Sequence, residues 1–371
     1  MKTTANDGDW KIMLRFLPAH WGSKATELGA LTRKRKIGSA ETLLRVLLIH
    51  LADGKSLRTT VAYASEVGLC KIEDVALLHR LRVSGEWLRW MALELLAALR
   101  EKRPDAELSP KFRVRIVDGT SISEPGSTGS DWRIHYCFQL KTLLCDTCTV
   151  TTTKVVEGFE RYGVEPDDLM VGDRGYCKRK GIVHVIKHQG HVMVRFHSTN
   201  LPLFTRRGKS LNVLELLRSL TEGQVGDWDV WFQDPDDGSL IKGRLCSLRK
   251  SEEAVELSKK RLLRMASKKG KELRPETLEY AEYITLFTTA SRRNLDGEGV
   301  LSLYRGRWQI ELAFKRLKNI IGVGHLPKSD PNSCIAWLYG KMFVALLVER
   351  LYREAESFSP WGYPLECPPE F

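Results

Sequence analysis

The first hundred residues carry a helical pattern of hydrophobic positions. From about residue 9 to residue 103, apolar residues recur every three or four positions, as at Leu43, Leu47 and Leu51. This spacing places them on one face of an α-helix, and glycines interrupt the pattern between segments. We therefore expect residues 1–103 to form a separate helical domain.

Two short helices with a tight break between them are expected inside this region. The first spans residues 57–69 and ends around Gly68, and the second spans residues 72–81. This spacing is typical of a helix-turn-helix that recognises DNA. An ordinary helical bundle shows the same spacing, so the pattern alone leaves both interpretations open.

The period of the pattern falls to two after Pro104, which predicts strands. Two of the predicted strands end in an aspartate beside a glycine: Asp118 in Val-Asp-Gly-Thr and Asp173 in Val-Gly-Asp-Arg-Gly. A single aspartate in such a place is usually a turn residue, whereas two in succession favour a shared site. The strands are expected at residues 112–118, 132–140, 143–153, 169–171 and 191–196, with a helix at 177–188.

The character of the chain changes again at about residue 199. A hairpin is expected at residues 226–248, followed by a charge-dense helix at 252–271, and we interpret this stretch as an insertion. Strong helical patterns follow at 300–321 and 334–355. The expected organisation is a helical domain, the first part of an α/β core, an insertion, and the last core helix with a C-terminal tail: 1–103, 104–198, 199–294 and 295–371.

One helical segment combines polar residues on a narrow stripe. At about 100° per residue, Tyr304, Arg307, Glu311 and Lys318 lie within about 60° of one another, directly beside an apolar face. Glu311 is a lone carboxylate in this segment among five cations, Arg305, Arg307, Lys315, Arg316 and Lys318. Such a carboxylate suits metal and phosphate chemistry. A salt-bridged surface, with cations four residues either side of Glu311, is the alternative.

The charge balance points to a polyanionic partner. The chain has 58 Lys or Arg against 46 Asp or Glu, a formal net charge of +12, and a pI near 9.3. Residues 174–209 contain nine Lys or Arg and no acidic residue. The backbone of double-stranded DNA is the natural counterpart of such a stretch.

Several other classes are excluded by what the sequence lacks. No apolar run approaches the roughly 18 residues of a membrane span, and the N-terminus has no signal-peptide core, so we expect a soluble intracellular protein. Only Cys145 and Cys148 form a C-x-x-C pair, without a second pair for zinc, which favours thiols packed on a strand. No glycine-rich nucleotide loop is present.

The four stripe residues resemble a known signature. Their spacing, Tyr304-(2)-Arg307-(3)-Glu311-(6)-Lys318, is similar to the Y-R-E-K signature of bacterial insertion-sequence transposases of the DDE class, the cut-and-paste group. The two aspartates described above resemble the first and second aspartates of that family. The resemblance implies an α/β fold: a ribonuclease-H-like catalytic core with a mixed sheet, interrupted by an insertion before the glutamate, and an N-terminal α-helical DNA-binding domain.

The resemblance also implies roles for individual residues. Asp118, Asp173 and Glu311 would be catalytic and would bind two Mg²⁺ or Mn²⁺ ions. Some members of the family stack a flipped base on a Trp in the strand before the last catalytic helix. That strand has Tyr283 and no Trp here, so the stacking residue stays open. The residues expected to contact DNA are Tyr304, Arg307, Lys318, Trp308 and Arg174.

The function implied is that of a DNA transposase. It would bind terminal inverted repeats through its N-terminal helices, hydrolyse phosphodiester bonds at the ends of its element, and join the 3′-OH to target DNA. The alternatives are a structure-selective nuclease that shares the core but performs no strand transfer, and an inactive DNA-binding derivative. We expect double-stranded DNA as partner, a homodimer when synapsed on DNA, no membrane association, and a cytoplasmic, nucleoid-associated location in a bacterium.

Overall fold

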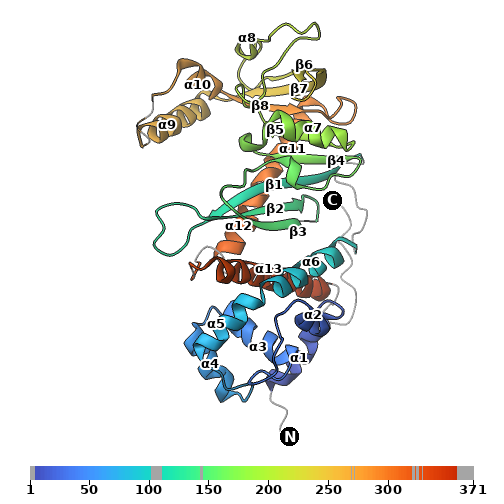
Figure 1. Cartoon of the computed structure of the whole chain (residues 1–371). Coiled ribbons are helices and arrows are strands. Elements are labelled where there is room, and N and C mark those ends of the chain that lie inside the picture. The colour runs from blue at the N-terminus through green and yellow to red at the C-terminus, as the bar shows by residue number, and fades with distance from the viewer. Residues whose placement is uncertain are drawn as a thin grey trace.

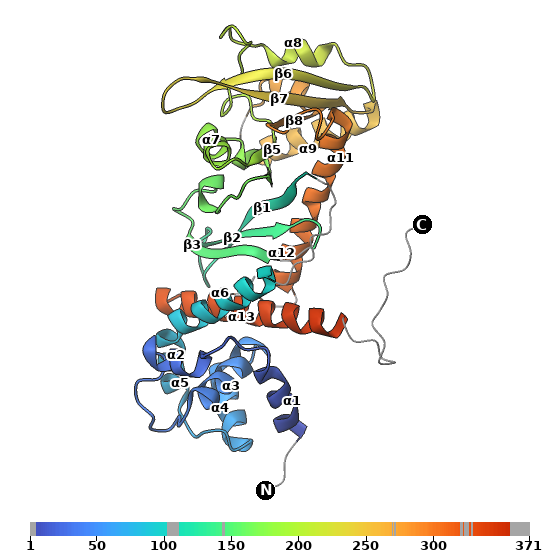
Figure 2. The same cartoon turned by 90° about the vertical axis from the view of Figure 1, so that its right-hand side faces the viewer.

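The structure is a computed structural model. It describes residues 5–101, 111–142, 145–268, 270, 272–319, 322, 326–327 and 329–356. Parts of the predicted segments, such as residues 320–321 and the tail beyond 356, lie outside the described residues. Figures 1 and 2 show an elongated molecule, with a helical body at one end and a sheet that runs to the other end.

The helical body contains six helices from the start of the chain. Their bounds are α1 (Ala5–Leu14), α2 (Trp21–Glu27), α3 (Ala40–Leu51), α4 (Leu57–Glu66), α5 (Asp74–Val83) and α6 (Gly85–Glu101). Ser39 and Ser56 cap α3 and α4, because each side chain accepts a hydrogen bond from a backbone amide three residues on. The predicted pair of short helices is therefore present as α4 and α5.

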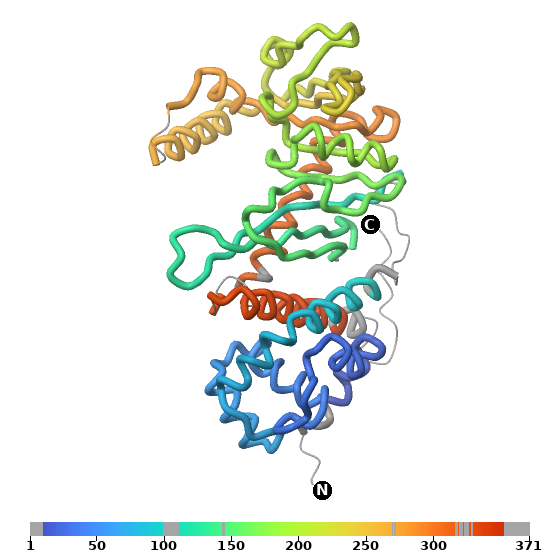
Figure 3. Tube along the Cα trace, viewed as in Figure 1, coloured from blue at the N-terminus to red at the C-terminus, as the bar shows by residue number. Residues whose placement is uncertain are grey.

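A helix from the far end of the chain completes this body. Figure 3 shows α13 (Pro331–Glu356) lying side by side with α6. It also approaches α3 closely, because a Cβ on Gly340 would lie 2.6 Å from Cδ1 of Leu51. Arg350 donates a hydrogen bond of 2.9 Å to the carbonyl of Phe16. The first and last helices therefore share one core.

Beyond the helical body lies an eight-stranded mixed sheet, in the order β3-β2-β1-β4-β5-β8-β7-β6. Strands β1, β4 and β5 pair in parallel and all other neighbours are antiparallel. The fold is therefore mixed α/β, as expected. The strands are β1 (Arg113–Ile122), β2 (Trp132–Gln139), β3 (Cys145–Thr152), β4 (Asp168–Gly172), β5 (His191–Arg195), β6 (Val225–Gln233), β7 (Leu240–Arg249) and β8 (Tyr283–Thr288).

Helices cover both faces of the eight-stranded sheet. One face packs on α7 and the other on α12, and α11 and α12 descend across the sheet to α13 in Figure 2. Within the described residues, no helix combines the length and apolar character needed to cross a membrane. The remaining helices are α7 (Arg179–Lys187), α8 (Val213–Arg218), α9 (Glu252–Lys268), α10 (Pro275–Tyr280), α11 (Gly297–Arg305) and α12 (Gln309–Asn319).

Two predicted boundaries are wrong. Strand β1 does not end at Asp118, because β2 pairs with it as far as Ile122 and keeps the Asp-Gly step within the ladder. The predicted helix at 300–321 is not continuous, since a 3-10 turn at Gly306–Trp308 separates α11 from α12. At that break a Cβ on Gly306 would lie 2.9 Å from Cδ2 of Leu140, so the glycine permits a close approach to the end of β2.

A buried ion network fixes β1 against β4. The guanidinium of Arg115 is 1% exposed and donates 2.7 Å and 2.6 Å hydrogen bonds to Oδ2 of Asp168 and the carbonyl of Gly163. It also pairs with Asp146, and Arg113 donates to Asp168 at 2.9 Å. Burial alone would lower the pKa of Arg115, but its interactions with Cys137, Asp146 and Asp168 raise it. Asp168 is therefore a structural acid and not a catalytic candidate.

We expect Asp168→Ala to lower the free energy of unfolding by about 3–5 kcal/mol, because it removes the buried carboxylate shared by Arg113 and Arg115 and leaves their charge only partly compensated. Urea unfolding would measure the loss. Glu165→Ala is the matched control, since this exposed carboxylate pairs with the same Arg113 and should cost less than about 1 kcal/mol. Equal losses in the two variants would contradict the assigned role of the network.

Candidate active site

The register of two parallel strands brings the predicted aspartates together. Ile116 of β1 pairs with Val171 of β4, so Asp118 and Asp173 occupy matching positions two residues further on. Asp118 is still within β1, whereas Asp173 follows the end of β4 and begins a 3-10 turn. The two carboxylates therefore lie at the same edge, where β4 leaves β1.

Backbone amides orient both carboxylates. Oδ1 of Asp118 accepts a 2.8 Å hydrogen bond from the amide of Gly119, and Oδ1 of Asp173 accepts one of 2.7 Å from the amide of Gly175. The backbone amide of each glycine thus orients the aspartate near it, and the glycine adds no side chain to the site. These hydrogen bonds explain why glycines stand beside the predicted aspartates, which the sequence pattern alone did not explain.

The first aspartate stands in a negative and largely buried environment. The pKa of Asp118 is raised to about 6, first by burial and also by the charges of Asp173 and Glu157, against the lowering effects of the Gly119 amide and of Arg307. A bound cation stabilises carboxylates that are crowded in this way, because it offsets the repulsion between their charges. The site therefore has the electrostatic character of a cation-binding site.

The residues of the Tyr-Arg-Glu-Lys signature reach this edge of the sheet from α11, α12 and the 3-10 turn between them. Nη1 of Arg307 lies 3.5 Å from Oδ2 of Asp118, and Nη2 donates a 2.9 Å hydrogen bond to Oε1 of Glu311. Tyr304 is half-buried with its ring 5.9 Å from the Arg307 guanidinium, and burial raises its pKa. Arg307 therefore links the first aspartate to the glutamate.

Glu311 is near the aspartates but is not joined to them. Its side chain is 63% exposed, against 18% for Asp118. Among the residues that the structure describes, no three Asp, Glu, His or Cys side chains form a group that could already hold a metal ion. The salt bridge that the sequence left as an alternative is present, since Arg307 occupies one oxygen of Glu311.

The residues fit a divalent metal in their chemistry. All donors here are carboxylate oxygens, which hard ions such as Mg²⁺ and Mn²⁺ prefer over the His and Cys ligands of zinc. Gly175 leaves open the space beside one of these oxygens, because a Cβ there would lie 3.0 Å from Oδ1 of Asp173. Asp118, Asp173 and Glu311 are the residues that could hold the metal.

The other predicted DNA contacts have different surroundings. Trp308 is 51% exposed in the 3-10 turn, and Lys318 is partly exposed near the end of α12. In the described part of the chain, neither forms a hydrogen bond or ion pair with Asp118 or Asp173. Both are accessible to a ligand that lies along α12.

Sequence reasoning missed Glu157, in the segment between β3 and β4. This carboxylate lies against Gly119, directly after the first aspartate. Its neighbours Val155 and Val156 continue a β-branched run and gave no sign of a functional residue. Only the paired strands bring it to the aspartates.

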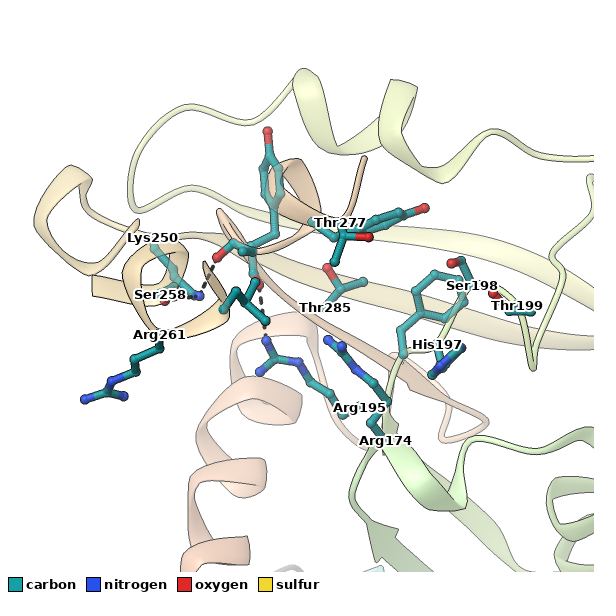
Figure 4. A pocket seen from close by; sticks show the side chains of 15 residues that line it. Arg174, Arg195, His197, Ser198, Thr199, Lys250, Ser258, Arg261, Thr277 and Thr285 are labelled. Atoms are coloured by element: carbon teal, nitrogen blue, oxygen red, sulfur yellow. Dashed lines mark hydrogen bonds between the residues drawn. The ribbon is translucent and has the colours of Figure 1, made fainter. Parts of the chain in front are cut away.

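A basic pocket adjoins this edge through Arg174, the residue after Asp173. Figure 4 shows Arg174 and Arg195 from the sheet side and Lys250 and Arg261 from the insertion side. Its lining contains no acidic residue, and it includes the aromatic rings of Phe196, Tyr280 and Tyr283. Arg174, predicted from the sequence, is thus part of a larger positive surface.

Lys250 is a half-buried lysine in the lining of the pocket. It donates hydrogen bonds to Oγ of Ser258 (2.8 Å) and to the carbonyl of Ala281 (2.5 Å). Burial, together with the charges of Arg195 and Arg174, lowers its pKa to about 8. A polyanion in the pocket would relieve this repulsion.

Comparison with known proteins agrees with the geometry. The sequence model of the family described as "Transposase DDE domain" matches residues 109–347. The putative transposase InsL of insertion sequence element IS186A from Escherichia coli (strain K12) is 31% identical over 358 residues, which cover 95% of this chain and 96% of that protein. The transposase for insertion sequence element IS421 from Escherichia coli is also 31% identical, over 359 residues with the same coverage. The chain therefore belongs to the DDE class of bacterial insertion-sequence transposases, enzymes that cleave and join DNA.

Proposed function

We propose that this transposase binds the terminal inverted repeats of its element, hydrolyses a phosphodiester bond at each end, and joins the resulting 3′-OH to target DNA. The observation that supports it most is the strand register that aligns Asp118 with Asp173, beside the Arg307–Glu311 pair. The mixed sheet with helices on both faces is consistent with a ribonuclease-H-like core.

Asp118, Asp173 and Glu311 would hold two Mg²⁺ or Mn²⁺ ions. When bound, such ions activate the attacking oxygen and stabilise the leaving oxygen. While Arg307 donates its hydrogen bond to Oε1, Glu311 can offer only its other oxygen to an ion, and release of that bond would free both oxygens. A DNA phosphate is the natural new partner for the guanidinium, which binds phosphate oxygens in a bidentate manner. We therefore infer that DNA binding and assembly of the carboxylates are coupled through Arg307.

The rest of the DNA would lie on the positive surfaces. Tyr304, Trp308 and Lys318 would contact the cleaved end along α12, and Arg174 would direct a strand into the basic pocket. Helices α4 and α5 would recognise the sequence of the terminal repeats. We propose that two chains meet when the ends are synapsed, and that the reaction takes place in the bacterial cytoplasm.

The central experiment incubates the purified chain with the terminal sequences of its element and Mg²⁺. Cleaved ends together with products joined to target DNA are expected. Cleavage without joined products would favour the nuclease alternative, and binding without cleavage would indicate an inactive derivative.

We expect Asp118→Ala, Asp173→Ala and Glu311→Ala each to abolish Mg²⁺-dependent cleavage and to leave binding of the ends largely intact, because all three residues serve the metal and not the DNA. Cleavage and gel-shift assays on the same preparations would check this. Glu165→Gln, at an exposed carboxylate outside the site, is the control and should retain cleavage. Substantial cutting by any of the three alanine variants would refute its assignment.

Arg307→Ala and Lys318→Ala test the phosphate contacts. Each should weaken DNA binding and flatten the slope of log affinity against log salt by about 0.9 for each lost phosphate contact. Arg305→Ala, which removes an exposed cation two residues from Arg307, is the control and should leave the slope unchanged. If Arg307 and Lys318 only stabilise the fold, the variants will have lower melting temperatures and an unaltered salt slope.

The basic pocket predicts a pH dependence of DNA binding. A free-state pKa of about 8 means that Lys250 loses its proton as the pH rises from 7 to 9, whereas bound phosphate favours the protonated form. Affinity for DNA should therefore fall by up to about tenfold over that interval. Lys250→Met should remove this part of the dependence.

Fluorescence anisotropy with labelled DNA at fixed ionic strength would measure that effect. Lys259→Met is the matched control on α9, because Lys259 is already paired with Glu282 at 2.7 Å. A pH profile that is identical in wild-type protein and Lys250→Met would show that DNA does not enter the pocket.

A further inference from the structure

Glu157 lies between the two glycines that hold the proposed catalytic aspartates, Gly119 in β1 and Gly175 after β4. A Cβ on Gly119 would collide with Oε1 of Glu157 and lie 3.0 Å from its Cδ. On the other side, the position of a Cβ on Gly175 would lie 3.6 Å from Oε2 of Glu157 and 3.0 Å from Oδ1 of Asp173. A single atom therefore spans the space between the carboxylates of Glu157 and Asp173.

The position of Glu157 is held from two directions. Lys178 donates a 2.7 Å hydrogen bond to its backbone carbonyl. Nε of Arg133, on β2, lies 3.2 Å from Oε1, and the side chain of Glu157 is 25% exposed. Arg133 is itself anchored by a 2.9 Å hydrogen bond to the carbonyl of Val155. The carboxylate is thus fixed against the site, with one oxygen turned to a cation and the other facing Gly175.

This placement differs from that of Glu311. Glu311 is mostly exposed and paired with Arg307, whereas the carboxylate of Glu157 lies between Gly119 and Gly175. A divalent ion such as Mg²⁺ retains several waters when one or two carboxylates bind it. Groups that hold those waters contribute strongly to metal affinity.

We propose that Glu157 is a positioning residue of the metal site, which accepts a hydrogen bond from a water ligand of the divalent ion bound by Asp118 and Asp173. The inference rests on the proposed metal-dependent function. It means that the chain binds an ion before DNA releases Glu311, with Glu157 supplying the third negative charge. Arg133 then sets the affinity, because its charge opposes the cation.

The test measures Mn²⁺ binding to the full chain without DNA, by the electron paramagnetic resonance signal of free Mn²⁺. We expect Glu157→Gln to weaken Mn²⁺ binding by about tenfold or more. Glu160→Gln, an exposed carboxylate three residues away, is the matched control and should bind as wild type does. Glu311→Gln should have a smaller effect than Glu157→Gln, and the reverse order would overturn the proposal.

A second variant separates this role from a structural ion pair. Arg133→Gln should tighten Mn²⁺ binding by about two- to fivefold, because it removes an opposing charge while Lys178 still holds the backbone carbonyl of Glu157. A purely structural pair predicts lower melting temperatures for both Glu157→Gln and Arg133→Gln and no change in Mn²⁺ affinity. If Glu157→Gln does not fold, Arg133→Gln decides alone: unchanged or weaker Mn²⁺ binding would overturn the proposal.

Asp118→Asn and Asp173→Asn distinguish this inference from the function on which it rests. If both lose Mn²⁺ binding while Glu157→Gln retains it, only the role of Glu157 fails. If the wild-type chain binds no Mn²⁺ and cleaves no DNA, the proposed function fails with it.

Discussion

The parallel pairing of β1 with β4 is the constraint on which the site depends. Because a strand's side chains alternate between faces, a shift of one residue between the two strands would send one aspartate to the opposite face. The buried network of Arg115, Asp146 and Asp168 resists that shift, since its charges are satisfied in one register only. This buried ion network therefore determines which residues meet at the edge of the sheet.

The same alternation explains why the signature helix reaches the correct aspartate. Ile116 belongs to the core that includes Ile310 and Phe314 of α12, whereas Val117 belongs to the core on the other face. Asp118 follows Ile116 by two residues and so shares the α12 face, where Arg307 meets it. Glu157 approaches instead through Gly119, the next residue along the strand. Glu311, which is paired with Arg307, and Glu157 therefore approach the site from different sides of β1.

Much of this site could be predicted from the sequence, because its features are local. The aspartates stand beside glycines at recognisable places, and the spacing from Tyr304 to Lys318 is fixed by one segment of chain. Two features depended on distant contacts and could not be predicted. The break at Gly306 depends on the close approach of Leu140. The position of Glu157 beside the aspartates depends on the pairing of strands that are distant in sequence. Periodicity describes one segment at a time and carries no information on such approaches.

The packing of α13 on the first helices has a consequence for synthesis of the protein. Residues at the beginning and end of the chain, such as Phe16 and Arg350, are bonded to each other across the whole sequence. Domains usually fold in order as they leave the ribosome. In this protein, however, the hydrophobic core of the helical body stays incomplete until α13, its last helix, has been made. An interrupted translation product would therefore carry the early helices with an apolar surface uncovered. Such fragments would be substrates for chaperones and proteases before they could compete for DNA.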